Sequence, residues 1–376
     1  MDTVNKYSKH TNFPDASITD PKTYIQPAVE MWCNGPRIHE FVGELYDVMS
    51  AYGDIMTLGE LSATPDTEMA LKYVSAKEKQ LSMVLHLDTA HMGKGKMEEK
   101  YDIRSWKLSE WKAVISKWQT FINGTDAWTS IFCENHDSGR SVSRYGSEDP
   151  RYRDLSAKML AIMMVTMTGT LILYQGQEIG MINAPRDWPI DEYQDVEGLG
   201  YYSEAAKQSA ASNDSTRKER VMEGLRILGR DHARLPMQWN TSPHGGFTNA
   251  TSKPWMRAHD LYPEINVEKQ EHDPTSVLSF WKTMLETRKK YRDLFVHGTF
   301  EILDFDNEGS FCFSKTRDDL GGLNALVALS FQDTPQQFTL TEKTRGMQLL
   351  VTNYPEQDAI DEATLRPFEG RIYVSC

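Results

Sequence analysis

The chain lacks the features that would point to a membrane, a nucleic acid or a secretory route. Nowhere among its 376 residues does an apolar run approach the ~18 residues of a membrane span, so no membrane partner is expected. The formal net charge of −13 argues against a nucleic-acid partner, because such proteins usually present a basic face. The opening stretch MDTVNKYSKH has none of the basic, apolar and small-residue regions of a signal peptide.

Cysteine is also scarce, and its spacing matches neither a CxxC pair nor a zinc-binding pattern. The four cysteines are Cys33, Cys133, Cys312 and Cys376. Their scatter predicts free thiols in a reducing compartment, and therefore a cytoplasmic location. Four glycosylation triplets would suggest the opposite, but such triplets often arise by chance; they begin at Asn123, Asn213, Asn240 and Asn249.

What the chain does contain is a repeating strand–helix pattern that begins near residue 54. Apolar runs predict strands within 54–61, 81–88, 127–137 and 170–180. Between them lie helical signals at 64–74, with Thr64 as the expected cap, at 107–124 and at 150–169. This alternation predicts an α/β fold with parallel strands.

Polar residues gather where these predicted strands end. They are Glu60, Asp88, residues 134–137 and residues 175–178. Both (β/α)8 barrels and open doubly wound sheets place their chemistry at the carboxyl ends of parallel strands. The pattern therefore indicates where a site lies but leaves both architectures open.

Two regions depart from the alternation. Residues 183–273 are rich in Asp, Pro, Ser and Trp, and look like an insertion in the last strand–helix connection, before a helix at 274–295. After residue 295, short strands separated by Asn, Gly and Pro turns predict a small antiparallel β-sandwich. We therefore expect one domain over 1–294, with the insertion, and an all-β domain over 295–376.

Two acidic motifs at strand ends are candidates for chemistry. Glu60 in MTLGEL, taken alone, is most simply a helix cap or a solvated acid. The sequence ENHD at 134–137 is harder to dismiss, because so many polar groups ending an apolar strand need either a site or a buried network. A zinc site is disfavoured, since His136 and Asp137 lack the HExxH or paired-histidine spacing.

A family resemblance emerges from five motifs that occur in order. They are ENHD with the following GR, LYQGQEIGM, RDWPIDEYQDVE, RDHARLPMQW and INVEKQ. Together they resemble the α-glucosidase branch of glycoside hydrolase family 13, and most of all the fungal maltases and oligo-1,6-glucosidases. The resemblance implies a (β/α)8 barrel followed by an antiparallel β-sandwich, and a small oligosaccharide as substrate. It implies neither a cofactor nor a metal ion.

The same resemblance suggests that part of the barrel is missing. The family's nucleophile follows a Gly-Phe-Arg sequence at the end of strand four, and MDTVNKYSK is similar to that motif from its variable position onward. The chain would then carry only the C-terminal half of the barrel, from the end of strand four to strand eight. Open strand edges and apolar faces would lead either to aggregation or to a partner that covers the open barrel edge. We therefore expect the chain alone to hydrolyse maltose negligibly.

The resemblance implies retaining hydrolysis by a pair of carboxylates with a third acid in support. Asp2 would be the nucleophile, Glu60 the acid/base, and Asp137 the acid that binds sugar hydroxyls and stabilises the transition state. Arg140 would steady the site, and one of two arginines in RDHAR would grip the terminal glucose. The expected substrate-binding residues are Thr3, His136, Arg140, Arg230 and Arg234.

Thr3 bears on the substrate, because in this family Thr or Ala after the nucleophile accompanies α-1,4 preference and Val accompanies α-1,6 preference. The resemblance therefore implies a maltase-like enzyme, with isomaltose-, sucrose- or trehalose-directed relatives as alternatives. Two non-catalytic alternatives are an oligosaccharide-binding protein and a transporter heavy subunit. The latter is disfavoured because no membrane span is visible and Asp2, Glu60 and Asp137 are all retained.

Overall fold

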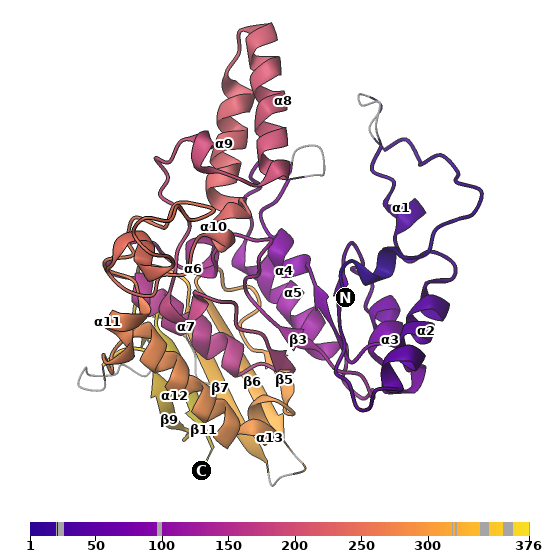
Figure 1. Ribbon diagram of the computed structural model, residues 1–376. Helices are drawn as coiled ribbons and strands as arrows, with labels where there is room; N and C mark the ends of the chain where they lie inside the picture. Colours follow the sequence, from indigo (N-terminus) through magenta and orange to yellow (C-terminus); the bar gives the residue numbers. More distant parts are fainter. Residues whose placement is uncertain are drawn as a thin grey trace. The chain divides into compact units, whose positions relative to one another are not determined.

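The computed structural model describes residues 1–19, 21, 26–95, 100–317, 319, 322–338, 346–355 and 364–375. Contacts divide the chain, whose ribbon is drawn in Figure 1, into two compact units. Unit 1 comprises Met1–Met92, Ala113–Ile131 and Thr168–Thr170, and unit 2 comprises Gly93–Lys112, Phe132–Met167 and Leu171–Cys376. Within the described ranges, no helix is both long and apolar enough to cross a membrane.

Unit 1 contains the first predicted strands. Strands β1 (Leu58–Leu61) and β2 (Met83–His86) pair in parallel, with Leu58 opposite Met83 and Leu61 opposite His86. Helix α3 (Thr67–Val74) connects them, as a parallel pair requires. Strand β3 (Ser130–Ile131) follows, and β4 (Thr170–Leu171) pairs with it. The four predicted strands and the α/β class are confirmed, although each strand is shorter than its apolar run.

The remaining elements of unit 1 are helical. The cap of α3 is Asp66, whose side chain accepts a hydrogen bond from the backbone N–H of Glu68, so the prediction of Thr64 was wrong. Asp66 stands directly before the first helical residue, where a cap is effective. The other helical segments are η1 (Val4–Lys6), α1 (Val29–Trp32), α2 (Ile38–Ser50), η2 (Ala76–Glu78), α4 (Asp88–His91) and the second half of α5 (Leu108–Thr120).

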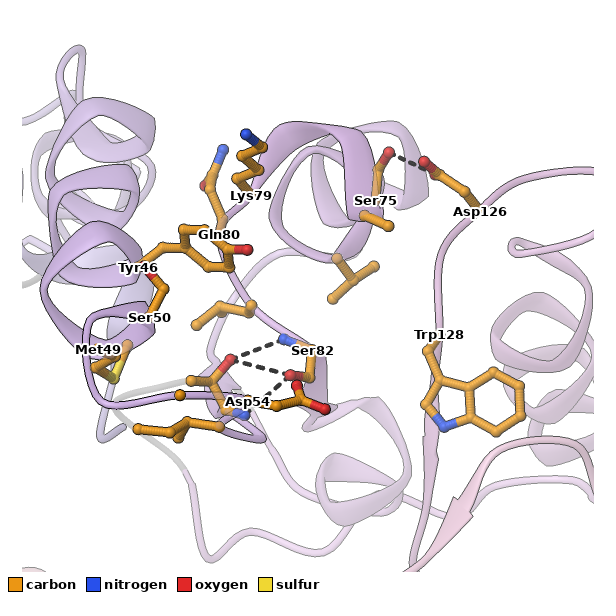
Figure 2. A pocket seen from close by; sticks show the side chains of 16 residues that line it. Tyr46, Met49, Ser50, Asp54, Ser75, Lys79, Gln80, Ser82, Asp126 and Trp128 are labelled. Atoms are coloured by element: carbon orange, nitrogen blue, oxygen red, sulfur yellow. Dashed lines mark hydrogen bonds between the residues drawn. The ribbon is translucent and has the colours of Figure 1, made fainter.

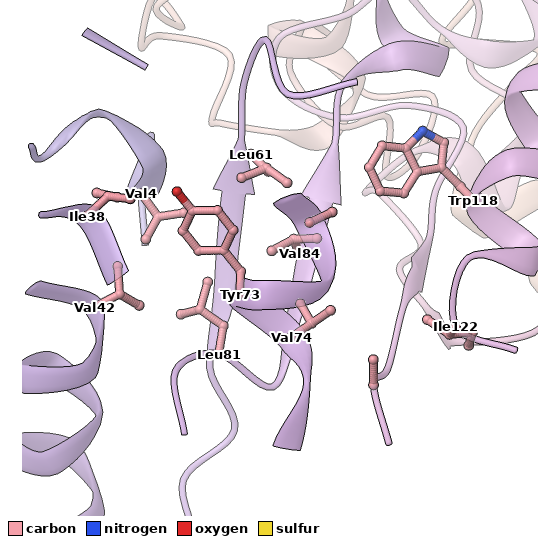
Figure 3. Close-up of a cluster of buried hydrophobic side chains, with 12 residues drawn as sticks. Val4, Ile38, Val42, Leu61, Tyr73, Val74, Leu81, Val84, Trp118 and Ile122 are labelled. Atoms are coloured by element: carbon pink, nitrogen blue, oxygen red, sulfur yellow. The ribbon is translucent and has the colours of Figure 1, made fainter. Parts of the chain in front are cut away.

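One apolar core is shared by η1, α2, α3, α5 and the strands β1 and β2 (Figure 3). Tyr73 and Val74 of α3 pack with Leu61 and Val84 of the two strands, and Trp118 of α5 belongs to the same cluster. The amphipathic spacing predicted for 107–124 places Trp118 in this core. The other fully buried members are Val4, Ile38, Val42, Ala70, Leu81, Ile122 and Ala127.

Unit 2 contains helices on either side of the long segment that we expected to be an insertion in the last strand–helix connection. Within 183–273 lie two long helices, α8 (Val196–Ser212) and α9 (Thr216–Leu228), which pack as a hairpin (Figure 1). The insertion also holds η5 (Ile190–Glu192), α10 (Asp231–Arg234), η6 (Pro243–Gly246) and α11 (Val267–Glu271). The other helical segments of unit 2 are α6 (Ser141–Tyr145), α7 (Arg153–Val165), η4 (Gln177–Ile179), α12 (Val277–Lys290) and α13 (Arg292–Phe295).

The all-β segment begins at Thr299 and confirms the predicted antiparallel strands. Its main sheet has the order β5-β6-β7-β11-β9, and every neighbouring pair is antiparallel. Strands β10 and β8 form a separate pair. The bounds are β5 (Thr299–Ile302), β6 (Ser310–Arg317), β7 (Leu323–Ser330), β8 (Gln336–Gln337), β9 (Gln348–Thr352), β10 (Thr364–Leu365) and β11 (Gly370–Val374). The end of the predicted strand at 336–341 lies outside the described residues.

This sheet belongs to the same compact unit as α7 and α12. Lys112 of α5 connects this helix to the turn between β5 and β6. Its side chain is fully buried, and Nζ donates hydrogen bonds to the carbonyl oxygens of Asp304 at 2.6 Å and Asn307 at 2.7 Å. Nζ also lies 3.0 Å from Oδ1 of Asp304.

Candidate active site

Asp2 and Glu60 lie next to each other in unit 1. The amino group of Met1 donates to the carbonyl oxygen of Leu58 at 2.6 Å, and the N–H of Glu60 donates to the carbonyl oxygen of Met1 at 2.9 Å. These two bonds flank Gly59 as in a parallel ladder, so Met1 lies opposite Gly59. Asp2 and Glu60 are the residues that follow Met1 and Gly59, so they continue this register by one position. The structure therefore brings together the backbones of the two acids that were expected to act as a pair.

Glu60 and Asp2 differ in their exposure to solvent and in their hydrogen bonds. Glu60 is half-buried and accepts a hydrogen bond from the hydroxyl of Ser62 at 3.0 Å. Asp2 is exposed, and its backbone carbonyl accepts a hydrogen bond from the phenol of Tyr7 at 2.8 Å. The carboxylate of Asp2 can therefore meet a ligand from solvent, whereas that of Glu60 is held at the end of β1.

Thr3 has a backbone conformation that is unusual for its residue type. Its φ and ψ are 40° and 46°, in the left-handed region, where η1 begins. A β-branched residue rarely adopts this conformation, and such strain clusters at functional sites. The sequence predicted a role for Thr3 but held no sign of this strain.

The polar residues at the end of β2 interact with other side chains of unit 1. His86 stacks on Trp118 with ring centroids 4.3 Å apart, and its burial lowers its pKa to about 3. Asp88 pairs with Lys117 and accepts a hydrogen bond from the indole of Trp118 at 2.9 Å. Burial opposes ionisation of Asp88, but these partners outweigh it and lower its pKa. The side chains at this end of β2 therefore stabilise the packing of α5 against the strand.

A cavity of about 320 Å³ lies at the opposite ends of these strands (Figure 2). Its lining includes Thr57, just before β1, and Ser82, just before β2. The N–H of Thr57 donates to Oγ of Ser82 at 3.0 Å, and the N–H of Ser82 donates to Oγ1 of Thr57 at 2.8 Å. Figure 2 shows these bonds in the pocket wall. Because Glu60 lies toward the other end of β1, this cavity is not the predicted site.

In unit 2, the motif ENHD divides into a buried half and an exposed half. Glu134 is buried, and its carboxylate lies 3.0 Å from the guanidinium of Arg140 and accepts from the N–H of Ser141. Arg140 is 1% exposed and also donates to the carbonyl oxygens of Gln175 at 2.7 Å and His232 at 3.2 Å. The guanidinium of Arg140 therefore lies beneath the surface, where it supports the loop, and its expected contact with substrate stays a prediction.

The exposed half of the motif faces the arginines of RDHAR. Oδ1 of Asp137 lies 2.6 Å from Arg234 and 3.4 Å from Arg230. Nε of Arg234 also donates to the carbonyl oxygen of His136 at 2.9 Å, and the ring of His136 lies 3.7 Å from Asp137. Four of the predicted residues, His136, Asp137, Arg230 and Arg234, are thus brought together.

Two further acids in this cluster were not predicted. Oδ1 of Asp195 lies 2.7 Å from Arg230 and 3.5 Å from Arg234, and Glu197 lies 3.4 Å from Arg230 and 2.6 Å from Lys100. Both acids lie in the DVE sequence at the start of α8. An acid before a helix is a recognised capping signal, but only the folded chain shows that it meets the arginines. Among the described residues, no group of three or more His, Cys, Asp or Glu side chains is arranged to hold a metal ion.

Comparison with solved structures shows which folds this chain resembles. A trehalose-6-phosphate hydrolase of Bacillus licheniformis aligns with a TM-score of 0.85 at 30% identity, over 99% of this chain and 64% of that one. The isomaltulose synthase SmuA of Protaminobacter rubrum aligns with a TM-score of 0.87 at 26% identity, over the same shares.

Curated relatives match along the whole chain. An α-glucosidase of Candida albicans is 40% identical over 375 residues, which cover 100% of this chain and 64% of that protein. The oligo-1,6-glucosidase IMA2 of Saccharomyces cerevisiae is 37% identical over 383 residues, with the same shares covered. The chain thus spans about 64% of the length of these relatives. Residues 1–298 match the family model described as alpha amylase, catalytic domain, and the chain therefore belongs to the alpha-amylase family.

Proposed function

We propose that this chain carries the reacting carboxylates of a retaining α-glucosidase, which releases terminal α-linked glucose from maltose-like oligosaccharides. The observation that supports this most directly is the register of Asp2 with Glu60. Neighbouring strands lie about 4.8 Å apart, and the two carboxyl groups of retaining glycosidases lie about 5–5.5 Å apart, against about 6.5–9.5 Å in inverting ones. Adjacent positions at two parallel strand ends therefore suit retention.

The proposed reaction has two steps with balanced proton transfers. In the first, a carboxylate oxygen of Asp2 forms a bond to the anomeric carbon while the glycosidic bond breaks, and Glu60 gives its proton to the departing oxygen. In the second, Glu60 takes a proton from water as that water attacks the anomeric carbon and breaks the ester to Asp2. Glucose leaves with its original anomeric configuration, and both carboxyl groups return to their starting states.

For Asp137 we propose a role in binding sugar hydroxyls and stabilising the positive charge of the transition state. Arg234 and Arg230 hold its Oδ1, and its side chain is 37% exposed, so it is fixed yet accessible. His136, 67% exposed beside it, would contribute a further sugar contact. The exposures of Arg230 and Arg234, 23% and 29%, suit contact between either arginine and a bound glucose.

The preferred linkage is proposed from Thr3. Its position directly after Asp2 favours α-1,4 over α-1,6 bonds by resemblance to the maltase group. The curated relatives include proteins named α-glucosidase and proteins named oligo-1,6-glucosidase, so both linkages occur among them. Because the chain spans 64% of these relatives, we also propose that by itself it hydrolyses maltose negligibly.

A chimera tests this function. The segment of the Candida albicans α-glucosidase that matches this chain is replaced by the chain, so that the relative supplies the rest of its own length. We expect the chimera to hydrolyse maltose faster than isomaltose, and NMR to detect α-glucose as the first product. A chimera that folds, as judged by circular dichroism, but shows no turnover would overturn the proposal. The chain alone serves as the second sample, and turnover comparable with the relative would refute its proposed inactivity.

A further inference from the structure

Asp195 links the arginines of the site to the start of helix α8. Its Oδ1 lies 2.7 Å from Nη2 of Arg230 and 3.5 Å from Nη1 of Arg234. Its Oδ2 accepts a hydrogen bond from the backbone N–H of Gly198 at 3.1 Å, which caps α8. One carboxylate therefore serves both the helix and the two side chains that hold Asp137.

We propose that Asp195 is a positioning residue, which orients Arg230 and Arg234 so that both face Asp137. Its side chain is 2% exposed, so it acts through the arginines rather than on a ligand. Arg230 uses Nη2 for Asp195 and Nη1 for Asp137, so the two carboxylates fix the plane of its guanidinium. The significance of this orientation for hydrolysis rests on the proposed function; the orientation itself does not.

The surroundings of Asp195 hold it in place and keep it charged. The carboxylate of Asp231, which lies in the same RDHAR sequence as the arginines, accepts from the N–H of Gln194 at 2.7 Å and from the N–H of Asp195 at 2.9 Å. Burial alone would raise the pKa of Asp195, but the hydrogen bonds from Arg230 and Gly198 and the arginine charges lower it. Asp195 is therefore an anion fixed at both its backbone and its side chain.

A simpler interpretation is that Asp195 only caps α8. The substitution Asp195→Asn distinguishes capping alone from positioning of the arginines, because Asn caps a helix about as well as Asp but carries no charge. If capping is the whole role, the variant keeps both its fold and its arginine environment. If Asp195 positions the arginines, the fold is retained while Arg230 changes.

The experiment measures the reaction of each arginine with phenylglyoxal in the full chain, followed by peptide mass spectrometry. Phenylglyoxal attacks the neutral guanidine, so a carboxylate that raises an arginine pKa slows the reaction. Burial would lower the pKa of Arg230, but its bond to Asp195 and the nearby acidic charges raise it. We expect Asp195→Asn to speed modification of Arg230 severalfold, because the substitution removes the carboxylate that raises the pKa of this arginine. Arg234, which keeps its 2.6 Å contact with Asp137, should change less.

The matched control is Asp66→Asn, the same substitution at the cap of α3 in unit 1. It should leave the reactivity of Arg230 unchanged. A folded Asp195→Asn variant in which Arg230 reacts at the wild-type rate would overturn the proposal. If that variant does not fold, the wild-type chain decides, with Arg153 as reference because its side chain, at 13% exposure beside Asp154, is less accessible than that of Arg230 at 23%. Slower reaction of Arg230 than of Arg153 supports the proposal, and equal or faster reaction overturns it. No sugar or turnover enters the assay, so an inactive chimera would leave this result standing.

Discussion

Asp2 and Glu60 are in register across two parallel chain segments, although 57 residues separate Met1 from the Leu58 carbonyl that fixes this register. The pairing uses backbone groups alone, so it places the two carboxylates without using either of them. Both remain available for chemistry, and their roles can be distinguished by substitution.

In the chimera, Glu60→Gln should reduce hydrolysis of maltose more than hydrolysis of p-nitrophenyl α-glucoside. A sugar leaving group needs a proton, whereas p-nitrophenolate leaves without one, and general acid catalysis contributes about 10²–10⁴-fold. Asp2→Asn should abolish hydrolysis of both substrates, because no other group forms the ester. Steady-state kinetics on the two substrates measures both effects. Glu68→Gln, an exposed acid on α3, is the control, and equal losses on both substrates for Glu60→Gln would contradict its assignment as the acid.

Thr3→Asn should stabilise the chain by about 1 kcal/mol, because the left-handed conformation costs a β-branched residue about that much and Asn tolerates it. Urea unfolding monitored by tryptophan fluorescence measures the difference. Thr11→Asn is the matched control, since Thr11 is exposed and lies outside the positive-φ positions. A Thr3 variant no more stable than the control would show that the strain is absorbed elsewhere.

Arg140→Met should destabilise the chain by about 3–5 kcal/mol, because it leaves the buried carboxylate of Glu134 without its ion-pair partner. The double variant with Glu134→Gln should recover part of this loss, since the stranded charge is then removed. Chemical denaturation of the wild type, the two single variants and the double variant measures the four stabilities of this double-mutant cycle. Arg151→Met, at an exposed pair with Asp149, should leave stability nearly unchanged. A double variant as unstable as the sum of both single variants would exclude this coupling.

Stability should fall as the pH drops from about 6.5 toward 4, and His232 should account for part of the fall. Burial lowers the pKa of its ring to about 4, so the unfolded chain binds the proton more readily across this interval. The stabilisation is therefore complete above pH 6.5 and is lost on acidification, to the extent of about 3 kcal/mol. The ring is neutral in the fold: Nδ1 accepts from the N–H of Ala184, and Nε2 lies 2.8 Å from the carbonyl oxygen of Leu225.

The check is the free energy of unfolding of His232→Gln as a function of pH. The variant should be less stable at pH 7, because it loses packing, but its slope between pH 6.5 and 4.5 should be shallower than that of the wild type. His10→Gln, at an exposed histidine, should keep the wild-type slope. A slope unchanged in His232→Gln would assign the acid sensitivity to other groups.

The sequence predicted the apolar strands because their hydrophobic runs are local signals. Glu60 and ENHD each follow such a run, and for that reason the sequence identified them as candidate site residues. It did not predict α8 and α9, whose buried residues face each other within a hairpin among many polar ones. Because the segment is rich in Asp, Ser and Pro at its edges, its sequence is typical of a loop, and the hairpin is evident only in the folded chain.

Arg140 shows why a motif does not determine a role. Nothing in the letters GR distinguishes an arginine that faces a ligand from one that lies below it. The distinction depends on Glu134, Gln175 and His232, which approach from three different segments. The contact of Asp195 with Arg230, 35 residues away, likewise depends on the folded chain, and the sequence around Thr3 does not indicate its left-handed conformation.

Lys112 has a consequence for anyone who wishes to shorten this chain. Its buried ammonium group depends on oxygen atoms of residues 304–307, which belong to the turn between β5 and β6. A truncation at residue 295, where the sequence suggests that a domain ends, would leave the ammonium group of Lys112 without these hydrogen-bond acceptors. The β-sheet at the end of the chain is thus part of what makes the helices fold, and the shortest autonomous version of unit 2 must include it.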